Sequence, residues 1–144
     1  MINTEDALKM LLERVPEFSP RWEKYLQEIQ AEQAKEEEEE RAVRQDYAIT
    51  ACTYMVEFTR HVGELIKADN FESFPRIFDF VEYLMVHGNQ DVQDGVATCF
   101  LENLINTASH GKFAATSFIK FLGPESRDYC KAWDEFCGAK TEGL

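Results

Sequence analysis

Apolar side chains recur every three to four residues along this chain, which is the spacing of one buried face of an α-helix. The clearest stretch predicts a helix from Asp46 to Ala68. Its apolar face is the longest in the chain and consists of Tyr47, Ala51, Tyr54, Met55, Phe58, Val62, Leu65 and Ile66. Because this face can contact the most neighbours, we expect the helix to lie at the centre of the fold.

The same spacing predicts two helices before it. The first begins at Asn3 or Thr4, whose side chains can cap a helix, and ends at Pro16. The second begins at Ser19, with proline at the first helical position. Its apolar stripe fades after Ile29, so the pattern leaves open whether the acidic residues beyond form a solvated helix or a frayed connection.

The C-terminal half is divided into short helices by glycine, proline and asparagine. The predicted starts are Ser73, then Asn89 or Asp91, then a short helix around Phe113, Phe118, Phe121 and Leu122, and a last helix after Gly123-Pro124. Gly95 lies inside the helix that is predicted to begin at Asn89 or Asp91. A glycine at such a position lowers helix stability and indicates close approach of a neighbouring backbone.

The last helix should bury an apolar stripe of its own. Its expected anchors are Tyr129, Cys130, Trp133, Phe136 and Cys137. The residues after it, Gly138 to Leu144, should be loosely held, as chain ends commonly are.

These elements predict an all-α fold in one domain, residues 1–144. About seven helices joined mostly by short turns should form a compact bundle of antiparallel neighbours. We expect HEAT-like stacked helix pairs in the C-terminal half, with a plain orthogonal bundle as the alternative. An acidic segment at about residues 30–44 should be solvated or frayed.

Charge narrows the classes of function. The chain has 15 Lys and Arg against 27 Asp and Glu, a net charge of −12, including the run Glu36 to Glu40. Such a protein repels nucleic acids and anionic membranes and attracts basic surfaces. Apolar residues make up 44% of the chain, which is too many for a disordered acidic tail.

No catalytic or cofactor-binding motif is present. The sequence lacks G-x-S-x-G, a phosphate-binding loop and a dinucleotide fingerprint. Glu57, His61 and Glu64 share one helical stripe, but one helix supplies only part of a coordination shell. We therefore expect a solvated polar face there, no metal, no cofactor and no enzyme activity, with a metal enzyme as a weak alternative.

The four cysteines, Cys52, Cys99, Cys130 and Cys137, lie within apolar helical patterns, and none forms a C-x-x-C pair. We expect reduced, buried thiols. The N-terminus shows no signal peptide, and charges interrupt every apolar stretch. These features predict a cytoplasmic protein.

Acidic and aromatic side chains gather opposite the apolar stripes of two predicted helices. They are Asp79, Glu82 and Tyr83 on the helix from Ser73, and Asp91, Asp94 and Glu102 on the helix from Asn89. If these helices pair, the six residues form one negative surface, either a solvated face or a docking surface for a basic protein.

The strings FPRIFDFVEYLMVHGNQDVQDGVATCFLENLIN and FIKFLGPESRDYCKAWDEF carry a resemblance to a family of small bacterial helical proteins. That family is similar in size, charge and helical make-up to immunity proteins of contact-dependent and other polymorphic toxin systems. The resemblance implies a cytoplasmic inhibitor that binds a basic toxin, for instance a nuclease. A helical scaffold or adaptor that binds another protein is the alternative.

Overall fold

The computed structural model describes residues 1–39 and 48–144, and in these ranges the chain is helical, with no β-strand. The helices are α1 (Thr4–Arg14), α2 (Ser19–Glu38), α3 (Ala51–Lys67), α4 (Phe74–His87), α5 (Gln90–Asp94), α6 (Glu102–Ser109), α7 (Thr116–Ile119) and α8 (Pro124–Cys137). A 3-10 turn, η1 (Pro16–Phe18), joins α1 to α2, and a π-helical segment, η2 (Gly95–Leu101), makes α5 and α6 one continuous helix. The predicted all-α bundle is confirmed.

Side-chain caps begin several of the helices where the sequence predicts them. The Asn3 side chain accepts a hydrogen bond from the Asp6 amide at 2.8 Å, and Asn89 caps α5 in the same way. Each bond satisfies an amide that the first helical turn leaves without a partner. Ser19 and Ser73 form no such bond, because both are already in helical conformation.

Helix α3 is central, as its long apolar face predicts. It packs against α1, α2, α5, η2 and α6. Phe58 is fully buried, with the Phe18 ring edge-on at 5.2 Å and the Phe100 ring stacked at 5.4 Å between centroids. A Cβ atom on Gly95 would lie 2.6 Å from the Ala51 Cβ, so the predicted close approach at this glycine is confirmed.

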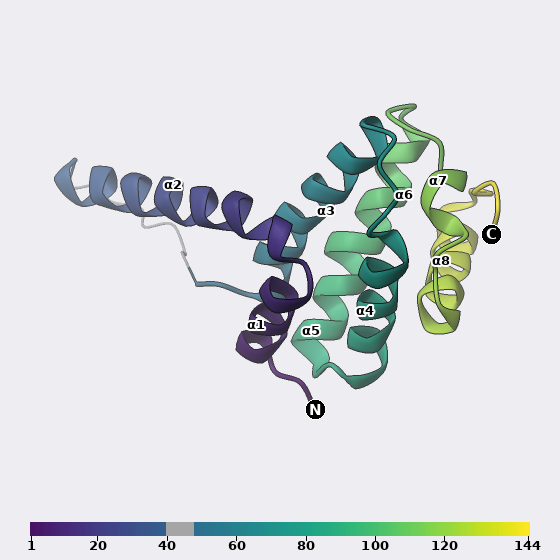
Figure 1. Ribbon diagram of the computed structural model, residues 1–144, viewed down its shortest axis with the longest axis horizontal. Coiled ribbons are helices and arrows are strands. Elements are labelled where there is room, and N and C mark those ends of the chain that lie inside the picture. The colour runs from purple at the N-terminus through teal and green to yellow at the C-terminus, as the bar shows by residue number, and fades with distance from the viewer. Residues whose placement is uncertain (40–47) are drawn as a thin grey trace.

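The C-terminal half stacks its helices side by side (Figure 1). Helix α4 contacts α5, η2 and α8, and α8 also contacts η2 and α6. The N-terminal end is fixed to this stack by two backbone hydrogen bonds, from the Ile2 amide to the His87 carbonyl and from the Asn89 amide to the Ile2 carbonyl. The terminus therefore lies beside the turn between α4 and α5.

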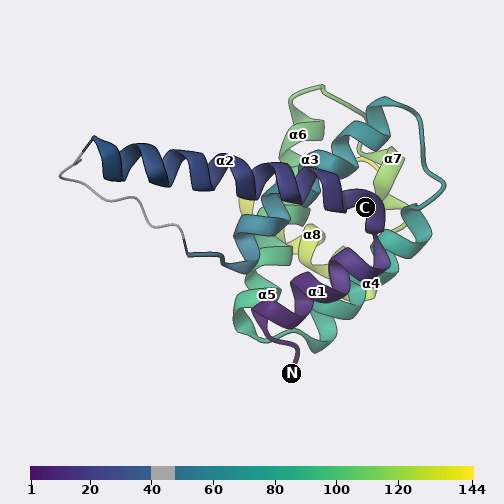
Figure 2. The same cartoon turned by 60° about the vertical axis from the view of Figure 1, so that its left-hand side comes forward.

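Helix α2 leaves the body as an arm (Figures 1 and 2). Its 20 residues span about 30 Å, and Trp22 near its start is its only buried side chain. The acidic segment is thus a solvated helix as far as Glu38, and residues 40–44 of it lie outside the described residues. In the described ranges, no helix is long and apolar enough to cross a membrane.

Two expectations for the C-terminal end are wrong. Phe136 is 82% exposed and Cys137 is also exposed, although Asp134 in the same last turn of α8 is buried. The residues after α8 are not loose. Asp134 accepts hydrogen bonds from the amide and hydroxyl of Thr141, and Arg127 donates to the Gly143 carbonyl.

Candidate partner interface

The first residue of the chain and helix α4 line one open hollow and form an exposed patch there, which we call the Tyr83 patch: Met1, Tyr83 and Val86. Their exposed fractions are 93%, 37% and 50%. The guanidinium of Arg14 lies 5.1 Å from the centroid of the Tyr83 ring and holds its orientation through a cation–π contact. Asp79 is exposed one helical turn before Tyr83. The face therefore combines an apolar centre with a carboxylate at its edge.

Glu82 does not face solvent in this way. Its carboxylate accepts hydrogen bonds from the Glu125 amide at 2.6 Å and from the Ser126 amide at 3.2 Å, and it also accepts the Ser126 hydroxyl. These amides belong to the first turn of α8, so Glu82 caps that helix from α4 and suits its positive end. Gly123 leaves room for the carboxylate, since a Cβ there would lie 2.3 Å from a Glu82 oxygen.

Asp91 has a similar role at the start of α3. Its carboxylate accepts the Ala51 amide at 3.0 Å and the hydroxyl of Thr4. Tyr54 donates to the Thr4 carbonyl at 2.9 Å, and burial, followed by the nearby Asp91 charge, raises the pKa of Tyr54. Asp91 therefore ties α1, α3 and α5 together.

Glu102 is buried, with 7% of its surface exposed. One of its oxygens has no hydrogen-bond partner among the described residues. Burial, and next the Glu102 charge, raise the pKa of Tyr129 on α8. Glu102 thus belongs to the contact between α6 and α8 rather than to the molecular surface.

Four of the six predicted interface residues are exposed: Asp79, Tyr83, Asp91 and Asp94, although the Asp91 carboxylate is bonded to the Ala51 amide. Asp94 accepts a hydrogen bond from the Gln90 side chain at 2.7 Å, on its own helix. Glu82, Asp91 and Glu102 hold helices together, so the candidate interface is smaller than the sequence pattern indicates. Its centre is the Tyr83 patch.

The predicted solvated stripe on α3 is wrong for Glu57. Its exposed fraction is 6%, and its carboxylate lies 2.8 Å from the Arg60 guanidinium and 3.8 Å from that of Arg21. Arg21 also pairs with Glu64, and this bond lowers the pKa of Glu64. In residues 1–39 and 48–144, no three His, Cys, Asp or Glu side chains are placed to hold a metal. That the stripe binds none stays a prediction.

His61 gives a test of pH dependence. Burial chiefly lowers its pKa, with Arg21 acting in the same direction and Glu17 and Glu64 opposing. The unfolded chain therefore takes up this proton at higher pH than the folded chain does. We expect the free energy of unfolding to fall as pH drops below the unfolded value of about 6.5, and His61→Gln to remove part of that slope. Urea denaturation between pH 5.5 and 7.5 measures this pH dependence, and His110→Gln, at an exposed histidine, is the control. Equal slopes in wild type and His61→Gln would refute the prediction.

A match to a protein-family model shows which family the chain belongs to. A model described as "Domain of unknown function (DUF7674)" matches residues 8–138. The chain belongs to the DUF7674 family. No curated protein and no solved structure gives a significant match. The matched range of this DUF7674 domain includes the arm, the Tyr83 residue and all four cysteines.

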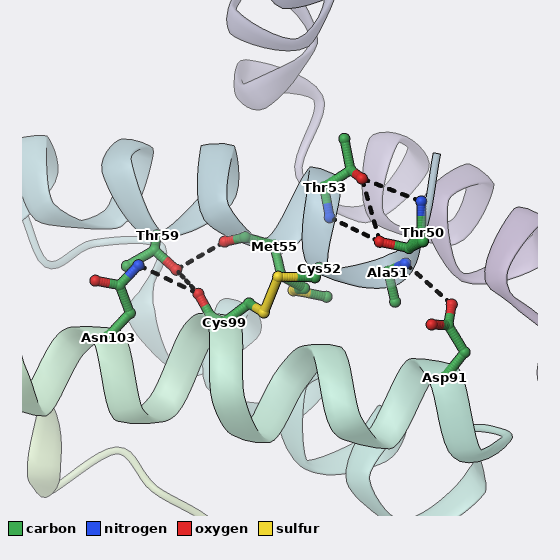
Figure 3. Close-up of a disulfide and its surroundings, with 9 residues drawn as sticks. All are labelled: Thr50, Ala51, Cys52, Thr53, Met55, Thr59, Asp91, Cys99 and Asn103. Atoms are coloured by element: carbon green, nitrogen blue, oxygen red, sulfur yellow. Dashed lines mark hydrogen bonds between the residues drawn. A yellow bond between two sulfur atoms is a disulfide. The ribbon is translucent and has the colours of Figure 1, made fainter. Parts of the chain in front are cut away.

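The cysteines of this DUF7674 chain differ from the expectation of four reduced, buried thiols. Cys52 on α3 and Cys99 on η2 form a disulfide (Figure 3). Cys130 is a buried free thiol whose pKa burial raises to about 12, and Cys137 is an exposed free thiol. The disulfide joins α3 to η2 beside the Thr59 hydroxyl, which lies 2.9 Å from the Cys99 carbonyl.

Sequence reasoning missed these cross-helix contacts for a common reason. Cys52 and Cys99 are 47 residues apart, and Glu82 and Ser126 are 44 apart. Helical periodicity assigns each residue a face but does not say which distant element covers that face. The Gly123-Pro124 pair marks the start of α8, and no local signal marks its capping residue on α4.

Proposed function

We propose that this chain is a non-enzymatic domain that binds a basic protein partner. The observation that carries the proposal is the Tyr83 patch on a molecule with a net charge of −12. Interfaces commonly place an aromatic anchor at an apolar centre and charged groups at the rim. Here Tyr83 would be the anchor, and Asp79 and Asp94 would attract the partner.

More specifically, we propose an immunity protein that inhibits a basic toxin, for instance a nuclease. Support comes from the acidic charge and from the resemblance of residues 74–136 to a family of small bacterial helical proteins, which is similar in size, charge and helical make-up to immunity proteins. A nuclease must hold a phosphate backbone, so its active site is basic and an acidic protein can mimic its substrate. The α2 arm carries Glu28, Glu32 and Glu36 to Glu39 away from the body and adds to the long-range field.

This proposal includes a cytoplasmic location, where the toxin would be made. Disulfides persist mainly in oxidising compartments. Thiol labelling in intact cells therefore tests the proposed location. Labelling of Cys52 and Cys99 would support a reducing compartment, and protection of both would indicate an oxidising one.

If a toxin gene lies next to the gene for this chain, the function is tested by co-purifying its product with this chain. We expect a stable complex that Tyr83→Ala weakens roughly 10- to 30-fold, mainly through faster dissociation. Phe136→Ala is the matched control, because Phe136 is an exposed aromatic residue outside the patch. Loss of affinity in Phe136→Ala with none in Tyr83→Ala would move the interface to α8.

A further inference from the structure

A pocket of about 390 Å³ lies between α3 and α6, with Arg21 of α2 and Phe113 of the loop after α6 at its edges. We call it the α3–α6 pocket. Its apolar lining consists of Val56 and Phe113, which are partly exposed, and of Leu104, which is fully buried. It is built from elements other than α4 and does not depend on the proposed partner interface.

The charged part of the pocket lining is mostly positive, although the molecule as a whole is strongly acidic. Arg21, Arg60 and Lys67 line the pocket together with one carboxylate, Glu64. Arg21 is paired with Glu64, and one guanidinium nitrogen of Arg60 is bonded to the buried Glu57. The Arg60 side chain is still 62% exposed, and Lys67 is exposed as well, with its charge helping to lower the pKa of Glu64. Two cationic groups therefore retain donors that can reach an anion.

Gly63 lines the pocket, and its backbone conformation does not require a glycine. It lies inside α3, where glycine is unfavourable compared with alanine, and its φ is not positive. A Cβ there would meet only a Phe113 ring carbon, at 3.6 Å, which is an ordinary contact. Gly95 is required by its close approach to Ala51, but packing imposes no such requirement at Gly63. Gly63 is itself buried, and the Phe113 ring lies beside it at the edge of the pocket.

We propose that the α3–α6 pocket binds a small organic anion that has one carboxylate and an apolar body. The carboxylate would lie at Arg60 and Lys67, which supply charge-assisted hydrogen bonds. The apolar body would lie against Val56 and Phe113, which line the pocket and are partly exposed. The combination of an apolar wall with a few convergent polar groups is typical of small-molecule sites.

The probe is 3-phenylpropionate, titrated into the full chain and followed by amide NMR shifts. We expect saturable shifts at Gly63, Thr107 and Phe113, with a Kd on the order of 1 mM, as suits a small ligand. The neutral 3-phenylpropanol should bind at least about fivefold more weakly. Shifts scattered over the whole surface, or equal affinity for the acid and the alcohol, would overturn the proposal.

Graded filling of Gly63 separates binding from folding. Gly63→Ala should raise the Tm and keep affinity within about threefold, because the new methyl fits and favours the helix. Gly63→Met should reduce affinity at least about tenfold, because its longer side chain would occupy the part of the pocket beside Phe113, and its Tm shows whether the variant still folds. Lys67→Gln should weaken binding about fivefold and the distant Lys131→Gln should not. Unchanged affinity in both Gly63→Met and Lys67→Gln would refute the site.

Discussion

Phe58→Ala should lower the free energy of unfolding by about 3–5 kcal/mol, the range for removing a buried phenylalanine ring. Phe58 has no exposed surface, and it joins α3 to η1 through Phe18 and to η2 through Phe100. Its loss would leave a cavity that the surrounding rings only partly fill. Urea denaturation followed by circular dichroism measures the change.

The control for this prediction is Phe136→Ala, the same substitution at an exposed position. It should change the free energy of unfolding by less than about 0.5 kcal/mol. A loss below about 1 kcal/mol in Phe58→Ala would contradict the central position of α3.

Removing the Cys52–Cys99 disulfide, by Cys52→Ala with Cys99→Ala, should cost about 2–4 kcal/mol of stability. The two cysteines are 47 residues apart, so the crosslink closes a long loop in the unfolded chain and reduces its conformational freedom. Denaturant midpoints with and without reductant measure the same effect in the unmutated chain.

Cys137→Ala is the control for the disulfide, because that thiol is free and exposed. It should leave the midpoint unchanged. Titration of the denatured, unreduced protein should find the thiols of Cys130 and Cys137 and no others. Reactive thiols at all four cysteines would contradict the crosslink and restore the expectation drawn from the sequence.

Much of the fold follows from local signals. Asn3 and Asn89 cap helices because their side chains reach amides in the following turn, and this geometry depends on a few consecutive residues. Gly95 could be placed at a tight helix contact because glycine within a helix usually needs a reason. Its partner Ala51 could not be named, since no periodicity relates two residues so far apart in the chain.

The candidate interface was harder to predict, because a polar residue opposite an apolar stripe can still be covered. Glu82 and Asp91 lie on the polar sides of their helices and cap other helices there. The spacing of Glu57, His61 and Glu64 predicts a solvated polar stripe on α3. Glu57 is nevertheless buried, and Arg21 of α2 reaches its carboxylate. Of the predicted residues, Asp79, Tyr83 and Asp94 are exposed without holding another helix, and Asp91 is exposed but bonded to the start of α3.

The α2 arm shows how little packing the chain uses to extend a helix. Beyond Trp22 the arm is covered only in part, yet helix continues through Glu36 and Glu37 to Glu38. Repulsion between like charges four residues apart costs only about 0.2–0.5 kcal/mol per pair. Ala, Gln, Glu and Lys favour helix intrinsically, which offsets that cost.

The most direct test of a basic partner is the rate of association, measured at several salt concentrations. We predict a steep fall as salt rises, because exposed charges are screened within about 8 Å at 0.15 M. Asp79→Lys and Asp94→Lys should slow association more than they speed dissociation, and the control Asp128→Lys on α8 should have a smaller effect. Replacing Glu36 to Glu39 by glutamine should slow association only modestly. If Asp79→Lys and Asp94→Lys leave the association rate unchanged and the glutamine replacements abolish association, the interface lies on the arm. An association rate that does not depend on salt would contradict a basic partner altogether.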